Sequence, residues 1–319
     1  MTKEVFLVSG CAGFIGGHVV ERLLNDGFSV VGVDDFSTGC PENIAPVLDR
    51  IRFVEGSVCD QATAAKAVDG VDRVIHLAAV PSVPRSVENP RLSAEAAIIG
   101  TVTLMDAARK AGVKRFVQAS SSSVYGDTET NPRREDLPLS PMSPYAVAKM
   151  TQEQFASVFW KCYGLDTASL RYFNVFGPRQ DPASKYAAVI PKFITEMMAG
   201  KRPEIFGDGL QTRDFTYIDN VVDANVCAAL CPNPLRGEAM NIGNGLTHTL
   251  VDLVEKLNAI LSTSLEPVYL PMRLGDVMHS RADITKAGEL IGYRPVIDFD
   301  EGLRRTAAFL IKAAPSTAS

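Results

Sequence analysis

The chain of 319 residues lacks several features that mark other classes of protein. It carries 32 lysines and arginines against 37 aspartates and glutamates, and its net charge of −5 argues against the clustered basic residues that bind nucleic acid. No apolar run approaches the roughly 18 residues that a membrane span needs. We therefore expect neither a nucleic acid nor a membrane as a partner.

The six cysteines also lack the spacings of metal and redox sites. None belongs to a Cys-x-x-Cys pair or to a Cys/His zinc pattern, so reduced thiols and no metal site are expected. The chain enters an apolar run at residue 4, and no signal-peptide pattern precedes it. These features together predict a cytoplasmic protein.

Short apolar runs alternate with amphipathic runs through the first half of the chain. Runs at 4–10, 29–35, 73–79 and 115–121 are typical of buried parallel strands, and runs at 18–26, 61–69 and 91–112 of helices. This alternation predicts an α/β fold with a doubly wound parallel (Rossmann) sheet over residues 1–174. Residues 175–319 are richer in Pro and Gly and are expected to form mainly a smaller, mixed α/β domain, with one later strand and helix returning to the sheet.

A glycine-rich turn follows the first predicted strand. It reads GCAGFIG, with glycines at 10, 13 and 16, and it opens a predicted helix. Such a turn lets backbone N–H groups approach a pyrophosphate at the helix N-terminus. Its place between a strand and a helix predicts a dinucleotide site, although the spacing is GxxGxxG and not GxGxxG.

An aspartate stands where the second predicted strand ends. Asp34 lies 18 residues after Gly16, and no arginine follows it in residues 34–37. A carboxylate here binds both ribose hydroxyls and repels a 2′-phosphate. The sequence therefore favours NAD over NADP.

The stretch SPYAVAKM, 143–150, places a phenol and an ammonium one helical turn apart. Ser143 caps a helix that starts at Pro144, so Tyr145 and Lys149 lie on one face. Two unit charges about 5 Å apart, at an effective dielectric of about 20, interact by roughly 3 kcal/mol, or about two pKa units. Lys149, with the positive nicotinamide of NAD⁺, is expected to lower the pKa of Tyr145 towards neutral pH.

The set of motifs resembles the extended short-chain dehydrogenase/reductase family, in the branch that modifies nucleotide sugars. The likeness covers nearly the whole chain and rests on GCAGFIG, VDD, HLAA, SSSSVYGD, SPYAVAK, RYFNVFGPRQ and GDGLQTRDFTYIDNV. It implies that Ser121, Tyr145 and Lys149 are catalytic. The residues that it implies for NAD are Gly10, Gly13, Phe14, Ile15, Gly16, Asp34, Asp35, Ser37, Thr38, Gly39, Ser57, Val58, Leu77, Ala78, Ala79, Tyr145, Lys149 and Tyr172.

The resemblance also implies residues that bind a nucleotide-sugar substrate. Asn174 would bind a phosphate, Val189 would offer backbone contacts to the nucleotide, and Arg213, Arg273 and Asp276 would hold the diphosphate and ribose. The full set is Arg85, Ser121, Ser122, Ser123, Asn174, Ala188, Val189, Lys192, Arg213, Arg273, Asp276 and Ser280. The apolar helices at 92–111 and 145–162 resemble the family's dimer contact, so a homodimer is expected.

The residues after Ser121 indicate the reaction. In this family the sugar is oxidised at C4, and Tyr145 would take the hydroxyl proton. Related 4,6-dehydratases carry an Asp-Glu pair before the Val-Tyr-Gly, and decarboxylases a Glu, whereas this chain has Ser122 and Ser123. No acid or base for elimination is present at those positions, so the resemblance implies a 4-epimerase that works through a 4-keto sugar.

Residues 171–194 resemble the branch that accepts N-acetylated UDP-hexoses. Ser280, in MHSRAD, stands where the family faces the C2 substituent, and a small residue there admits an N-acetyl group. We expect UDP-GlcNAc and UDP-GalNAc as substrates, with UDP-Glc and UDP-Gal. Alternatives are a UDP-glucuronate 4-epimerase, another NAD-dependent nucleotide-sugar enzyme such as a dehydratase or decarboxylase, and a non-catalytic NAD-binding regulator.

Three positions depart from the family pattern. Ser57 replaces an Asp that touches the adenine amine, so adenine binding is expected to be weaker or to use Asp60. Ala97 replaces an Asn that braces the serine strand. Pro81 stands where some relatives carry a lysine near the nicotinamide.

Overall fold

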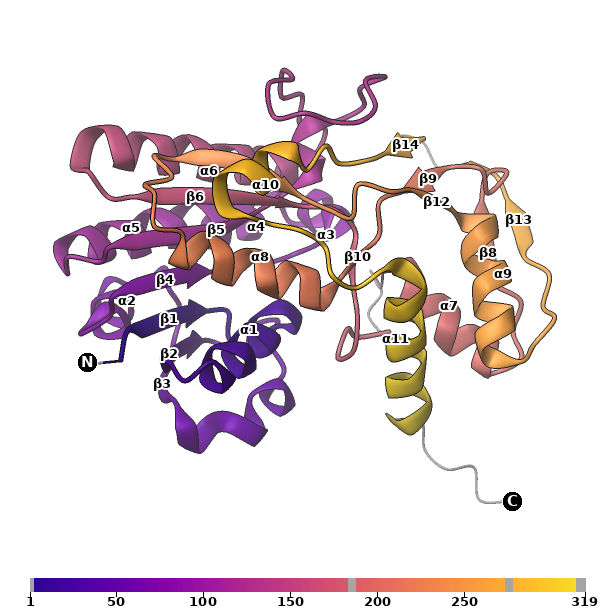
Figure 1. The fold of residues 1–319 in the computed structure, drawn as a ribbon, viewed down its shortest axis with the longest axis horizontal. Coiled ribbons are helices and arrows are strands. Elements are labelled where there is room, and N and C mark those ends of the chain that lie inside the picture. Colours follow the sequence, from indigo (N-terminus) through magenta and orange to yellow (C-terminus); the bar gives the residue numbers. More distant parts are fainter. Residues whose placement is uncertain (1–2, 183–187, 273–277, 314–319) are drawn as a thin grey trace.

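A seven-stranded parallel sheet forms the centre of the first half (Figure 1). The computed structural model describes residues 3–182, 188–272 and 278–313. In spatial order the strands are β11 (Glu238–Ile242), β6 (Thr167–Tyr172), β5 (Arg115–Ser121), β4 (Arg73–His76), β1 (Val5–Ser9), β2 (Ser29–Asp34) and β3 (Arg52–Glu55). The order reverses at β1, which is the doubly wound arrangement, so the predicted fold class is confirmed.

Helices cover both faces of this sheet because alternate side chains of a strand point to opposite faces. Phe6 and Val8 pack in one core with α1 (Phe14–Asn25) and α8 (Ile218–Leu230). Leu7 packs in the opposite core with α2 (Gln61–Val68), α5 (Gly100–Lys110) and α6 (Pro144–Tyr163). The carboxyl ends of the strands remain uncovered by these helices, and parallel sheets of this kind bind ligands at that edge.

The segment predicted as one helix over 91–112 is three consecutive pieces. These are α4 (Pro90–Ala94), a π-helical turn at Glu95–Ile99 and α5. Before them a short helix, α3 (Val83–Glu88), follows β4. The π turn inserts a wider turn of backbone into this helix. Such turns are frequent near functional sites.

Residues after 175 form smaller sheets and helices, and two elements return to the main sheet. Strand β11 pairs with β6, and α8 packs against α1. The small strands are β7 (Val175–Phe176), β8 (Glu204–Phe206), β9 (Thr212–Arg213), β10 (Thr216–Tyr217), β12 (His248–Thr249), β13 (Val268–Leu270) and β14 (His279–Ser280). The helices are α7 (Val189–Met198), α9 (Leu250–Leu261), α10 (Thr285–Ile291) and α11 (Phe299–Ala313). Among the described residues, no helix is long and apolar enough to cross a membrane.

Candidate active site

The turn between β1 and α1 needs glycine at two positions for steric reasons. Gly10 has a φ of +68°, in the left-handed region that side chains disfavour. A Cβ on Gly16 would lie 2.0 Å from the carbonyl oxygen of Gly10, closer than any real contact. The tight turn brings backbone N–H groups to the start of α1, where a pyrophosphate can approach them.

Asp34 ends β2 with its carboxylate held in place. Its two oxygens accept hydrogen bonds from the backbone N–H of Ala12, at 2.8 Å, and of Phe36, at 2.9 Å. Burial raises the pKa of this carboxyl group, and these two hydrogen bonds oppose the shift. The side chain is thus oriented before any ligand arrives, as binding of two ribose hydroxyls requires.

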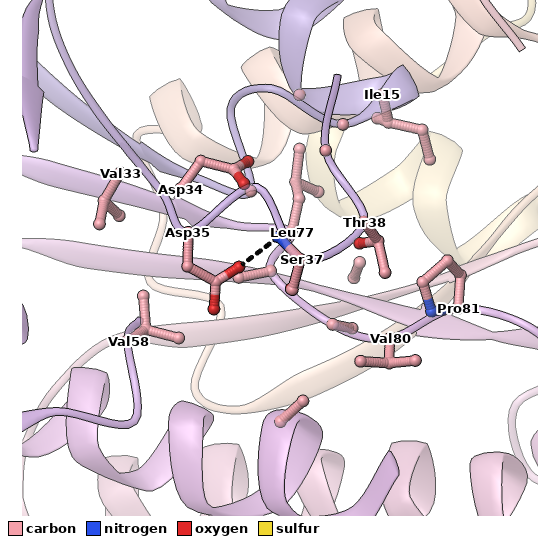
Figure 2. A pocket seen from close by; sticks show the side chains of 18 of the residues that line it. Ile15, Val33, Asp34, Asp35, Ser37, Thr38, Val58, Leu77, Val80 and Pro81 are labelled. Carbon is pink, nitrogen blue, oxygen red and sulfur yellow. Dashed lines mark hydrogen bonds between the residues drawn. The ribbon is translucent and has the colours of Figure 1, made fainter. Parts of the chain in front are cut away.

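One cavity lies along the carboxyl ends of β1, β2 and β4, and Figure 2 shows its lining. Asp34 and Asp35 lie at one end, with the Ser37 N–H donating to the Asp35 carboxylate at 2.9 Å, and Val80 and Pro81 lie at the other. Every residue that the sequence assigned to NAD lines this cavity. Sequence reasoning missed seven lining residues, most of them small or apolar, which are Val33, Gly56, Cys59, Val80, Ala96, Ala119 and Ser120, and it had noted Pro81 only as a departure from the family.

Tyr145 and Lys149 stand on the face of α6 that lines this cavity. Ser143 caps the helix by accepting from the Ala146 N–H at 3.1 Å. The Lys149 ammonium donates to the Ala119 carbonyl at 2.8 Å and lies 5.9 Å from the centre of the Tyr145 ring.

Burial shifts the pKa values of both Tyr145 and Lys149. Burial raises the pKa of Tyr145 above its ordinary value, and the Ser121 hydroxyl opposes that shift. Burial also lowers the pKa of Lys149 to about 8, although Glu153 acts against this shift. Burial is the largest influence on Tyr145 in the protein chain by itself, so the lowering of its pKa by Lys149 together with the nicotinamide of NAD⁺ stays a prediction for the loaded enzyme.

Hydrogen bonds tie the serine-bearing strand β5 to α6. Gln118 donates to the Gln152 carbonyl at 2.8 Å, and the Ser120 hydroxyl donates to Glu153 at 2.5 Å. Ala97 lacks the amide of the family's Asn, and its carbonyl accepts instead from Thr101. The strand is therefore braced through α6 despite this substitution.

A second cavity continues from the first towards β14. Ile15, Ser120, Tyr145 and Tyr172 line both cavities. Six residues that the sequence assigned to the substrate line the second one, namely Ser121, Ser122, Ser123, Asn174, Arg213 and Ser280. Arg85, Ala188, Val189 and Lys192 line neither cavity, and Arg273 and Asp276 lie outside the described residues.

Sequence reasoning missed one buried charge in this second cavity, Arg133. It comes from the connection between β5 and α6 and is 2% exposed. Its sequence, NPRRED, resembles a solvent-exposed loop, and no signal in it distinguishes Arg133 from its exposed neighbour Arg134.

Ser57 and Asp60, the two residues considered for adenine binding, occupy different places in the structure. Ser57 lines the first cavity. Asp60 does not, because its carboxylate caps α2 by accepting from the Thr63 N–H at 2.7 Å. Of the two residues, Ser57 is therefore the one in the cavity wall, and Asp60 serves the start of α2.

All six cysteines are free. Among the described residues, no group of three or more His, Cys, Asp or Glu side chains could hold a metal ion. The turn at Gly10–Gly16 and the oriented carboxylate of Asp34 fit an adenine dinucleotide.

Comparison with known proteins agrees with this geometry. Residues 6–243 match the model of the NAD dependent epimerase/dehydratase family. The UDP-glucose 4-epimerase of Mycolicibacterium smegmatis is 41% identical over 308 residues, covering 95% of this chain and 97% of that protein.

Two solved structures are similar over nearly the whole chain. UDP-glucose 4-epimerase of Thermotoga maritima with UDP-glucose has a TM-score of 0.91 and 39% identity, covering 97% of this chain and 99% of that chain. UDP-N-acetylglucosamine 4-epimerase of Methanobrevibacter ruminantium, in complex with UDP-N-acetylmuramic acid, has a TM-score of 0.93 and 37% identity, covering 98% of this chain and 100% of that chain. The chain therefore belongs to the NAD-dependent epimerase/dehydratase family, in its UDP-sugar 4-epimerase branch.

Proposed function

We propose that this enzyme interconverts UDP-GlcNAc and UDP-GalNAc, and also UDP-Glc and UDP-Gal, by inversion at C4. The observation that carries the substrate assignment is Ser280, a small side chain in the wall of the second cavity, 6% exposed. A larger ring at that position would occupy volume that the packed wall cannot yield. The complex of the Methanobrevibacter relative with an N-acetylated UDP-sugar supports the same assignment.

Tyr145 lines both cavities, so it would face the coenzyme on one side and the sugar on the other. We assign it the role of base towards the C4 hydroxyl, and Ser121 that of a hydrogen-bond partner at the same oxygen. Lys149 would hold the nicotinamide ribose. When bound, NAD⁺ would supply the acceptor for the C4 hydride and, after the 4-keto sugar has turned over, the donor that returns it to the opposite face.

The pair Ser122 and Ser123 supports epimerisation over elimination or decarboxylation. Both side chains lie in the second cavity, and neither is an acid or base at neutral pH. A dehydratase needs proton transfers at C5 and C6, for which these hydroxyl groups offer no carboxylate.

The proposed division of labour follows the chain. We assign coenzyme binding mainly to residues 1–174 and substrate binding mainly to 175–319, with Arg213 and Ser280 in the second part and the substrate residue Asn174 at the boundary. The six free cysteines are compatible with a reducing compartment, and we place the enzyme in the cytoplasm.

We also propose a homodimer through the apolar face of α6 and its neighbours. Val147 and Val158, on one face of α6, are exposed, and so are Leu92 and Ile99 nearby in the chain. A double substitution, Val147→Glu with Val158→Glu, should convert the dimer to a monomer in light scattering. A wild-type monomer, or an unchanged dimer in the variant, would contradict this interface.

The test of the substrate assignment is paired kinetics on both sugar sets. Ser280→Tyr should abolish turnover of UDP-GlcNAc and spare UDP-Glc, because only the N-acetyl group meets the new ring. Ser280→Ala is the matched control, and it should retain both reactions. Equal loss of both activities, or loss of neither, would remove the main support for the N-acetylated substrate.

A further inference from the structure

Arg133 lies beside the strand that carries Ser280, in the wall of the second cavity. Its backbone N–H donates to the Arg281 carbonyl at 2.8 Å, and its carbonyl accepts from the Asp283 N–H at 2.9 Å. These bonds fix the residue against the segment that follows β14. The side chain lines the cavity together with Ser123 and Ser280.

The guanidinium of Arg133 is buried without a counter-ion among the described residues. Its Nε and Nη2 have no hydrogen-bond partner, and Nη1 makes one long bond, 3.4 Å, to the Ser122 carbonyl. The guanidinium also lies over the Tyr125 ring, whose centre is 5.8 Å away. The Ser123 hydroxyl in the same wall is likewise buried and without a partner.

Two other arginines are buried in the described part of the chain, and both are paired. Arg115 binds Asp166 at 2.8 Å and accompanies this with bonds to backbone carbonyls. Arg171 binds both oxygens of Glu153, at 2.9 and 2.7 Å. The lack of a partner for the Arg133 guanidinium is therefore specific to this cavity and does not hold for the other buried arginines described.

An unpaired buried cation is costly, and a ligand that neutralises it recovers that cost. Burial lowers the pKa of Arg133 and the charge of Arg213 acts in the same direction, whereas Tyr125 and Asp127 act against this shift without forming an ion pair with Arg133. A sugar hydroxyl or amide carbonyl would satisfy a donor but leave the charge uncompensated. A carboxylate accepts from two guanidinium N–H groups at once and supplies the opposite charge.

We propose that Arg133, assisted by Ser123, binds a carboxylate carried by the sugar, so that acidic nucleotide sugars are the preferred substrates of this site. The inference rests on the proposed 4-epimerase function and extends its substrates from the neutral UDP-hexoses to acidic ones, which would bind more tightly at the same site. The carboxylate can come from C6 of a hexuronate or from an acidic ether on the ring. Both sources present the same group to the same guanidinium.

Calorimetry on the NAD-loaded enzyme with two matched pairs of ligands tests this. UDP-glucuronate against UDP-Glc probes the C6 source, and UDP-N-acetylmuramate against UDP-GlcNAc probes the ether source. We expect the acidic member of at least one pair to bind about tenfold to hundredfold tighter, the scale of hydrogen bonds to charged groups. The pair that shows the preference identifies the source.

Variants then connect the preference to the residue. Arg133→Gln should abolish the preference, and Arg133→Lys, which keeps the charge without the planar fork, should retain part of it. Arg134→Gln is the matched control, since Arg134 is exposed and paired with Asp136 at 3.0 Å, and it should keep the full preference. UDP, which carries no sugar, reports whether each variant still folds around the nucleotide.

Two results would overturn the inference. The first is that the wild type binds both members of each pair with equal affinity. The second is that Arg133→Gln still binds UDP and keeps the full preference for the acidic ligand. Epimerisation followed by NMR on the neutral sugars is measured separately. If no sugar is epimerised while the acidic preference persists, the proposed function fails and the binding inference stands.

Discussion

The two connected cavities differ in how their polar groups are occupied before a ligand binds. In the first cavity, called the coenzyme cavity below, Asp34 already accepts hydrogen bonds from two backbone N–H groups. Lys149 already donates one to the Ala119 carbonyl. In the second cavity, called the sugar cavity below, two nitrogens of Arg133 and the hydroxyl of Ser123 have no hydrogen-bond partner among the described residues. The first site is complete as folded, whereas the second presents groups that a substrate must satisfy.

The difference predicts which cavity selects the substrate. A site built from backbone and pre-oriented side chains suits a coenzyme that stays bound through many turnovers. A site with unsatisfied donors discriminates strongly, because a ligand that lacks the matching acceptor leaves them buried and unpaired. We therefore expect substrate choice to depend on the sugar cavity alone.

The largest effect should come from Tyr145, one of the residues that line both cavities. Tyr145→Phe should lower turnover by about 10²-fold or more, the usual scale for loss of a general base, while NAD stays bound. Stopped assays on enzyme of known NAD content measure this. Turnover close to that of the wild type would show that Tyr145 is not the base that removes the proton of the C4 hydroxyl.

The comparison between paired and unpaired arginines makes a prediction about stability. Arg171→Met leaves the Glu153 carboxylate buried and should lower the free energy of unfolding by about 3–5 kcal/mol. Arg133→Met removes a cation with no counter-ion and should leave that free energy unchanged or raise it. Urea denaturation without ligands measures both, and an equal loss in the two variants would contradict the contrast.

The coenzyme cavity makes a pH-dependent prediction through Lys149. Its pKa is about 8 in the folded chain against an ordinary 10.5, so the unfolded chain holds more protons between these values. Stability should therefore rise with pH across that window, by about 1.4 kcal/mol for each unit of pKa difference. Lys149→Met should remove this rise in denaturation curves of the coenzyme-free enzyme, and a slope that survives the substitution would assign it to another group.

The smallest effect concerns Ser57, a position in the coenzyme cavity that departs from the family pattern. Ser57→Asp restores the acceptor that the family uses towards the adenine amine. NAD should bind more tightly by about 0.5–1.5 kcal/mol, the net value of one hydrogen bond. Calorimetry on the coenzyme-free enzyme measures the change, and unaltered affinity would show that Ser57 already serves as well.

Local sequence was sufficient for the coenzyme cavity because its determinants are local. The turn at Gly10–Gly16, the strand end at Asp34 and the helix start at Ser143 each follow from neighbouring residues. Strands β3 and β6 were not identified individually, and the π turn at Glu95–Ile99 divides a segment that looked like one helix.

Arg133 could not be found in this way because its burial depends on a segment about 150 positions further along the chain. The loop that carries it reads as polar and exposed, and only the pairing with residues 281–283 encloses it. Whether its charge is paired is likewise a property of the folded cavity. Sequence pattern therefore predicts the coenzyme more readily than the sugar.

The most direct test of the account follows the reaction from both sides by NMR. Purified enzyme with its bound NAD, and no added reductant, is incubated with UDP-GlcNAc in one sample and UDP-GalNAc in another. The account predicts that both samples reach the same mixture of the two sugars. No conversion, or a dehydrated or decarboxylated product from a UDP-sugar, would contradict it.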